Sequence, residues 1–345
     1  MKIIHCSDIH LDAAMGSYLS QEKAEERRNE LLLTFVRMVR YAAKNQAEAV
    51  LIVGNLFDGE HISQATLSIV EQCISGNPHI SFFYASAYMD QDPFIRAMYG
   101  KYPNLIFFLE ERTYRLKGNI VISAPFSPDE LVLDPSDVNI VLYHGMIQPA
   151  HWRGRNIDYL ALGYYHELQE GSLGIRGRYC YSGCLEGRDF EETGDKGFVR
   201  LDIEGGVLDP VFIKAAKRGF HIIPIDISNL QGPEELDRCI ATALTEKSIP
   251  NSDFVRIQLI GGNTRADLQL PYLEQRYAGH FYFFQIVPTH AEADINNSFP
   301  AYDISLRGEF IRLVTESSLP ESQKTMVIRT GIAALEGRSI TEGNL

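Results

Sequence analysis

Carboxylate and imidazole side chains follow several apolar runs in the first half of the sequence. Asp8 and His10 come just after KIIHC, His144 ends NIVLYH, and His166 follows YLALG. In open α/β sheets, ligands bind beyond the carboxyl ends of strands, so side chains at these positions can converge. Asp8 and His10 alternate, and an extended backbone would point both side chains the same way. A carboxylate with imidazoles suits Mn, Fe or Zn, so the pattern predicts a divalent-metal site.

The apolar runs around these residues are predicted to be strands. Their lengths and uniform hydrophobicity are typical of strands that are covered on both faces. The predicted strands are residues 2–6, 49–53, 80–85, 104–109, 119–124, 139–144, 159–163 and 197–203. Residues 24–45 show apolar side chains at helical spacing. Alternation of strands with helices indicates a layered α/β fold.

The pattern changes near residue 219. Strands at 221–227, 254–261 and 281–287 and helices near 233–246 and 268–277 predict a small α/β unit, and two helices separated by Pro320 are predicted from about residue 303. We therefore expect three parts, at 1–218, 219–290 and 291–345.

The composition is that of a folded globular protein. The chain has 345 residues and a mass of 38.9 kDa, with 45% hydrophobic and 22% charged residues and a mean hydropathy of -0.13, which argues against wholesale disorder. Its formal net charge is -13, and both halves are acidic. Nucleic acid would therefore need a local basic or metal-lined patch, because the overall field repels phosphate.

Membrane and export signals are not evident in the sequence. No run approaches the ~20 apolar residues of a transmembrane helix. The segment MKIIHCSDIHLD carries acids and histidines where a signal peptide would carry its apolar core. We therefore expect a cytoplasmic protein that does not contact a membrane.

The ordered motifs resemble those of the calcineurin-like metallophosphoesterases, whose signature combines D-x-H, G-D-x-x-D, G-N-H-D/E, an isolated His and G-H-x-H. Within that superfamily the sequence is most similar to SbcD-type DNA repair exonucleases of the YhaO-like branch. The supporting segments are SDIHLD (7–12), LFDG (56–59), YLALGYYHELQ (159–169), YSGCLEGRDFEETGDKGFVRLDIE (181–204), SLRGEFIRLV (305–314) and GIAALEG (331–337). The resemblance implies two sheets flanked by helices (an α+β sandwich), with a small C-terminal α/β cap.

The resemblance also implies two metal sites, and this chain departs from both. Carried over by position, the first site uses Asp8, His10, residue 55 and His166, and the second uses residues 55, 88, 164 and His144. The departures are Asn55 for the bridging Asp, Tyr88 for Asn, Met89 for the His that assists the leaving group, and Tyr164 for His.

These departures change the metal chemistry. Two divalent ions ~4 Å apart repel by roughly 16 kcal/mol at an effective dielectric of 20. Asn55 has no net charge to offset that repulsion, and the phenols of tyrosines titrate near 10. We therefore expect at most one divalent ion, first of all Mn, with Fe or Zn as alternatives, or no ion at all.

Several residues near these motifs could serve function or structure. Trp152, Arg153 and Arg155 form an aromatic-basic cluster that could stack on and clamp a nucleic-acid strand, or be a plain surface loop. Arg188 either approaches the mouth of the site or lies on a similar loop. Asp58 is expected to cap or orient a loop rather than to bind metal.

Two classes of function follow from the resemblance. The first is a metal-dependent DNA exonuclease with a degenerate, weak or inactive centre; the second is a non-catalytic subunit that binds DNA ends or an ATPase. The implied partners are DNA and a coiled-coil ATPase of the SbcC type, and a homodimer is a further alternative. The likeness places ATPase docking on an apolar face of the C-terminal helices, which could instead pack on the chain's own cap: Ile311, Leu313, Val314, Val327, Ile328, Ile332 and Leu335.

Overall fold

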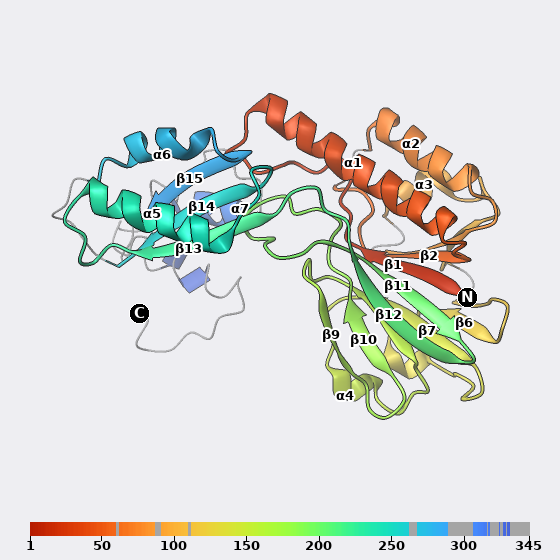
Figure 1. Cartoon of the computed structure of the whole chain (residues 1–345). Helices are drawn as coiled ribbons and strands as arrows, with labels where there is room; N and C mark the ends of the chain where they lie inside the picture. Colours follow the sequence, from red (N-terminus) through yellow and green to blue (C-terminus); the bar gives the residue numbers. More distant parts are fainter. Residues whose placement is uncertain are drawn as a thin grey trace. The chain divides into compact units, whose positions relative to one another are not determined.

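The computed structural model of the chain forms two compact units (Figure 1). It describes residues 1–59, 62–86, 91–109, 112–261, 268–288, 306–315, 317, 324, 327–328 and 330–331. Unit 1 comprises Met1–Ile222, Pro250–Arg256 and His280–Phe283, and unit 2 comprises Ile223–Ile249, Ile257–Gly279 and Phe284–Leu345. The chain thus passes between the two units several times.

Unit 1 contains a six-stranded sheet with the order β12-β11-β1-β2-β3-β4. Strands β1 to β4 are parallel, whereas β11 pairs antiparallel with both β1 and β12. The strands are β1 (Lys2–Ser7), β2 (Ala49–Val53), β3 (Ser81–Ala85), β4 (Leu105–Phe107), β11 (Gly197–Glu204) and β12 (Val207–Lys214). The carboxyl ends of β1 and β2 therefore meet at one edge of the sheet.

A second six-stranded sheet in unit 1 has the order β5-β6-β7-β8-β10-β9. Its four inner strands are parallel and its two edge strands are antiparallel. The strands are β5 (Thr113–Arg115), β6 (Ile120–Ser123), β7 (Val138–His144), β8 (Tyr159–Gly163), β9 (Gln169–Ser172) and β10 (Arg178–Tyr181), with short helices η1 (Pro128–Glu130) and α4 (Pro149–Trp152) between them.

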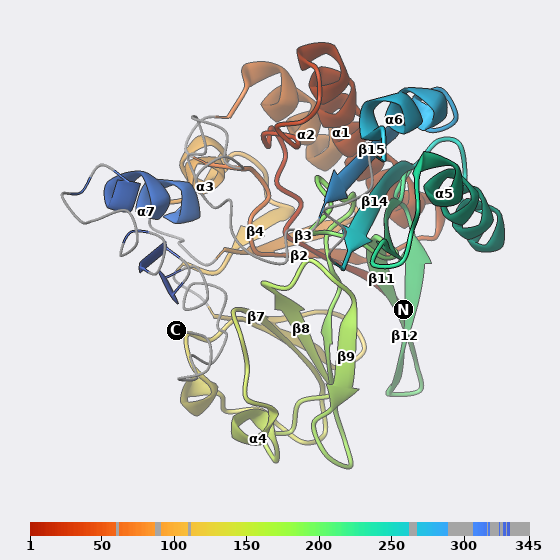
Figure 2. The ribbon, with the colours of Figure 1, turned by 90° about the vertical axis from the view of Figure 1, so that its left-hand side faces the viewer.

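The two sheets pack face to face, and helices cover the outer face of the first (Figure 2). Apolar side chains such as Leu51 of β2 and Ile140 of β7 form the core between the sheets. On the other face of the first sheet, Ile52 packs with Phe35 in the core under the helices. The helices are α1 (Gln21–Lys44), α2 (Gln64–Ser75) and α3 (Pro93–Met98). The predicted mixed α/β fold with helix-flanked sheets is confirmed at this level.

The smaller sheet has the order β13-β14-β15. Its strands are β13 (Phe220–Asp226), β14 (Phe254–Ile260) and β15 (Phe283–Pro288), and unit 2 also contains α5 (Pro233–Lys247), α6 (Leu270–Ala278) and α7 (Leu306–Thr315). Tyr277 joins three elements of unit 2, because its hydroxyl donates to Asp237 of α5 at 2.7 Å and its ring lies 5.4 Å from that of Phe284.

The predicted apolar face of the C-terminal helices is exposed only in part. Leu313 is 60% exposed and Val327 38%, whereas Val314 and Ile328 are buried. The side chains of Ile311, Ile332 and Leu335 lie outside the described residues, as does most of the second predicted helix.

A buried charge cluster ties α1 to the segments that follow β10 and β12. Arg27 forms ion pairs with Glu30 and with Glu186, and Glu30 also accepts hydrogen bonds from Lys217 at 2.5 Å and from Arg218 at 2.7 Å. Burial alone would raise the pKa of Glu30, but these three cations outweigh it and lower the pKa from 4.5 to about 2. Ionised Glu30 therefore stabilises the fold above about pH 4.5, and this contribution is lost as the pH falls toward 2.

We predict that Glu30→Gln lowers the free energy of unfolding by about 3 kcal/mol at pH 7, because it removes the counter-charge of buried cations. The loss should shrink between pH 4.5 and 2. Urea unfolding at several pH values measures it, with Glu25→Gln on the exposed face of α1 as the control. Equal losses in both variants at every pH would contradict the assignment.

Candidate metal centre

Asp8, His10 and His166 converge in unit 1. One ligand atom from each lies within 4.8 Å of the others, and the two imidazole centroids are 5.2 Å apart. Asp8 and His10 follow β1, and His166 follows β8, so the site lies where strands from both sheets end. The structure therefore brings together three residues that the sequence proposed as ligands of one ion.

The backbone reaches this arrangement by a route that the sequence analysis did not predict. Asp8 has φ of 42° and His10 has φ of 52°, so neither residue has the extended backbone under which alternate side chains would point the same way. Backbone hydrogen bonds explain the turn, because the N–H groups of His10 and Leu11 donate to the carbonyls of Asn55 and Leu56. The loop after β1 is thus fastened to the loop after β2 in left-handed conformations that non-glycine residues rarely adopt.

Each of the two imidazoles is held by its own carboxylate. His10 Nδ1 lies 2.8 Å from Asp58 Oδ1, and His166 Nδ1 lies 2.5 Å from Glu192 Oε1. Burial lowers the pKa of His10 and outweighs the opposing effect of Asp58. The net shift favours the neutral ring. Metal-binding histidines usually donate their second ring N–H to a carboxylate, so this geometry leaves Nε2 of both rings available to an ion.

Arg188 lies beside these carboxylates. Its Nη2 donates to Glu192 Oε1 at 2.6 Å, and its Nη1 lies 3.8 Å from Asp58 Oδ1. Burial would raise the pKa of Glu192, but hydrogen bonds from His166 and Arg188 outweigh burial and hold that pKa well below its usual range. Arg188 thus lies at the mouth of the site, which is one of its two predicted placements. There it pairs with carboxylates of the protein itself.

The carboxylate of Asp8 is almost fully enclosed. Its Oδ1 accepts from His144 Nε2 at 2.9 Å, and its Oδ2 accepts from the Tyr164 N–H at 2.7 Å. Burial raises the pKa of Asp8, yet the hydrogen bond from His144 and the other donors bring the net shift below the usual value. Gly54, with φ of 99°, allows this approach, since a Cβ there would lie 2.3 Å from Asp8 Oδ1.

Two of the described positions assigned to a second ion make other contacts, His144 through its side chain and Asn55 through its backbone. His144 uses Nε2 to bond Asp8, and Asn55 is engaged through its backbone with Asp8 and His10. Tyr164 is 44% exposed, and its ring lies 6.1 Å from that of His144. Tyr88, Met89 and Asp90 lie outside the described residues.

The proposed aromatic-basic cluster does not form a stacking surface. Trp152 is 3% exposed and packs in a core with Leu160 and Leu162, so its ring is not available to a base. Arg155 donates to Asp129 and to the Pro128 carbonyl, which ties it to the neighbouring loop. Arg153 is exposed.

The donor set fits a single divalent ion. One carboxylate and two imidazoles are the mixed oxygen and nitrogen ligands that Mn, Fe and Zn accept, and water can complete the shell. Sequence reasoning did not identify Glu192 as a partner of His166. Glu192 lies only four residues after Arg188 in EGRDFEE, and nothing in that spacing indicates a contact with His166.

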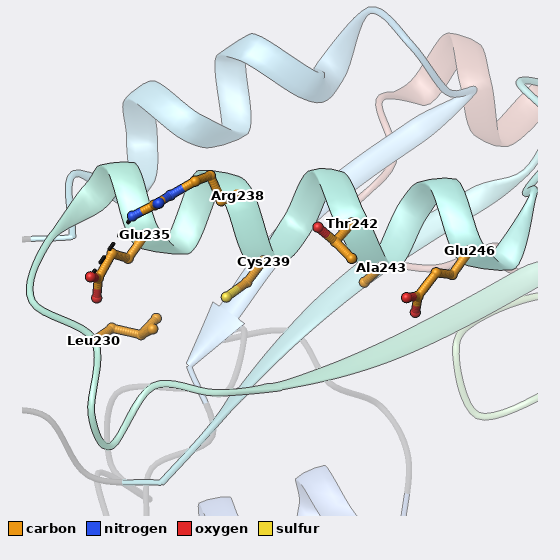
Figure 3. A pocket seen from close by; sticks show the side chains of 7 residues that line it. All are labelled: Leu230, Glu235, Arg238, Cys239, Thr242, Ala243 and Glu246. Atoms are coloured by element: carbon orange, nitrogen blue, oxygen red, sulfur yellow. Dashed lines mark ion pairs between the residues drawn. The ribbon is translucent and has the colours of Figure 1, made fainter.

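Two pockets lie in the described part of the chain near charged side chains. One of 360 Å³ adjoins His166, and half of its lining residues are acidic; it is lined by Tyr165, His166, Glu167, Gln169, Arg188, Asp189, Glu191 and Glu192. Another, of 540 Å³, lies on α5 of unit 2 (Figure 3), lined by Leu230, Glu235, Arg238, Cys239, Thr242, Ala243 and Glu246. In the second pocket Glu235 and Arg238 pair with each other at 3.8 Å, so their charges offset one another.

Fold and site together define a mixed α/β protein with a carboxylate–histidine cluster where strands of its two larger sheets end. The chain matches no protein-family model, and a search of curated proteins finds no match either. Among the described residues, no helix is both long and apolar enough to cross a membrane.

We predict that the chain binds one Mn²⁺ and that His166→Gln abolishes saturable binding, because it removes one of three ligands. His144→Gln should keep the stoichiometry of one, since His144 contacts Asp8 rather than the open face of the cluster. Isothermal titration calorimetry and elemental analysis measure both. Binding of two ions per chain, or equal losses in the two variants, would contradict this assignment.

We predict that Gly54→Ala disrupts the site. The new Cβ would meet both Asp8 Oδ1 and the His144 ring. Gly59→Ala is the matched control, because Gly59 also has positive φ, 71°, but nothing lies within 4 Å of its added Cβ. The control should lose about 1 kcal/mol from backbone strain and keep Mn²⁺ affinity, whereas Gly54→Ala should lose both stability and Mn²⁺ binding. Similar behaviour of the two variants would argue against close packing at Gly54.

Proposed function

We propose that this protein is an SbcD-like homologue of DNA repair exonucleases that retains a single-ion centre and is weak or inactive as a nuclease. The observation that carries the proposal is the convergence of Asp8, His10 and His166, with ligand atoms within 4.8 Å, beside an Asn at the bridging position. The sequence motifs supply the resemblance to the metallophosphoesterase superfamily, and the two helix-flanked sheets are compatible with it.

The chain's own residues would hold the ion and limit the chemistry. Asp8, His10 and His166 supply the ligands, while Asp58 and Glu192 orient the two rings. A bound divalent ion would polarise a phosphodiester and lower the pKa of water. Met89 stands where the superfamily has a His, and a thioether cannot donate the proton that a leaving group needs. General acid catalysis is worth roughly 10²–10⁴-fold, so its loss alone predicts a slow enzyme.

A non-catalytic role is the second candidate, and one observation favours it. The 360 Å³ pocket beside His166 carries four carboxylates against Arg188, which is itself paired with Glu192. Such a wall repels a phosphate backbone unless a cation offsets it. In this alternative the chain keeps the fold as a subunit that binds DNA ends or an SbcC-type ATPase, and the acidic wall favours the ATPase over a phosphate backbone.

Restoration of the four departed positions tests the proposal. We predict that Asn55→Asp, Tyr88→Asn, Met89→His and Tyr164→His made together raise Mn²⁺ stoichiometry to two and increase DNA exonuclease activity above the native level. Activity is measured on linear duplex DNA with Mn²⁺ and with a chelator. The same variant carrying His166→Gln is the control and should lose the gained activity.

The outcomes separate the candidates. Native protein that already degrades DNA as fast as the restored variant would refute the degenerate-site proposal. Native protein that binds one ion and DNA ends, with no nuclease activity gained on restoration, would support the non-catalytic subunit.

A further inference from the structure

We propose that Glu192, held by Arg188, is a positioning residue that fixes the ring tautomer of His166 and so presents Nε2 to a divalent ion. The inference rests on the proposed single-ion centre. In this inference Arg188 orients Glu192 rather than contacting nucleic acid.

The geometry around His166 Nδ1 decides which atom carries the proton. Glu192 Oε1 lies 2.5 Å from Nδ1, a distance that requires a hydrogen between the two atoms. Arg188 Nη2 lies 3.1 Å from the same nitrogen, so a ring with a bare Nδ1 could accept from the guanidinium instead. That alternative would set the Nδ1 lone pair against a carboxylate oxygen at 2.5 Å, which is repulsive. The hydrogen therefore belongs on Nδ1, and the lone pair is on Nε2.

Glu192 is itself held on every side. Arg188 donates from Nη2 to Oε1 at 2.6 Å, and its backbone N–H donates to Oε2 at 2.8 Å. Both carboxylate oxygens therefore accept charge-assisted or backbone hydrogen bonds, and this favours the ionised form that accepts from a ring N–H. Arg188 and Glu192 are only 18% and 8% exposed, so little water competes for these bonds.

The backbone of His166 is fixed as firmly as its ring. Lys196, which is 3% exposed, donates from Nζ to the His166 carbonyl at 2.7 Å. The Cys184 N–H donates to the same oxygen at 3.4 Å. With the main chain and Nδ1 both held, the direction of Nε2 is set before any ion arrives, which reduces the free-energy cost of binding.

Glu192→Gln tests the role directly, because glutamine keeps the size of the side chain but loses its charge and one of its two acceptor oxygens. Long-range ¹H–¹⁵N spectra of metal-free protein should show His166 with hydrogen on Nδ1 in the native chain and a mixture of the two tautomers in the variant. Mn²⁺ affinity, measured by calorimetry, should fall 10- to 100-fold. Glu191→Gln is the control: it lowers the charge of the same pocket equally, and Glu191 is exposed.

Arg188→Lys is the second arm and guards against a Glu192 variant that fails to fold. It keeps the charge but loses the planar fork, so any change reflects geometry. We expect a mixture of His166 tautomers and severalfold weaker Mn²⁺ binding. Combined with Glu192→Gln, it should add little to the loss, because both act through one ring.

The results that overturn the inference are specific. Native His166 with its hydrogen on Nε2, or a Glu192→Gln protein that matches Glu191→Gln in tautomer and Mn²⁺ affinity, would remove the positioning role. Arg188→Lys that weakens DNA binding but leaves the tautomer and Mn²⁺ affinity unchanged would return Arg188 to the nucleic-acid interpretation. The tautomer is measured without metal, so a native chain that binds no Mn²⁺ would refute the proposed function while the spectra still decide the role of Glu192.

Discussion

The buried carboxylate of Asp8 is the constraint on which the rest of the site depends. It is 1% exposed, and a charge in such a place is tolerated only when donors surround it. Those donors come from loops of both sheets: Asn55 after β2, His144 at the end of β7, and Tyr164 after β8. One side chain thus fastens the first sheet to the second at the edge where strands end.

The same enclosure limits what the site can hold. A carboxylate that already accepts from His144 and from two backbone N–H groups has less capacity for an ion than one that faces open solvent, and Asn55 adds no charge beside it. The two imidazoles are better oriented for an ion, because Asp58 and Glu192 each hold the Nδ1 atom of one ring. The proposed centre would therefore use chiefly nitrogen ligands with a single anion, and this balance would favour one ion of moderate affinity over a pair of ions.

Most of the buried strands could be predicted from the sequence, because they appear in it as apolar runs. The segments AVLIV and YLALG form strands with the predicted bounds, Ala49–Val53 and Tyr159–Gly163. The apolar runs and helical spacing do not predict α2, α3, β9 or β12. The candidate ligands could be predicted from their places after strands, but the left-handed turn at Asp8 and His10 could not, because it depends on hydrogen bonds to Asn55 and Leu56. Neither alternative for Trp152 places its ring in a core, because the nearby Arg153 and Arg155 say nothing about the side chains that enclose it.

The pairing of β1 has a consequence for biosynthesis. This strand lies inside its sheet between β2 and β11, and Lys2 is paired with Asp202 across that ladder. At synthesis rates of about 5–20 residues per second, the partner emerges from the ribosome roughly 10–40 s after β1 does. During that interval one edge of an apolar strand has no neighbour, and the loop of Asp8 awaits His166. The second edge of β1 can be paired only once β11 is released, and the candidate ligands Asp8, His10 and His166 can assemble only after translation has passed well beyond β1.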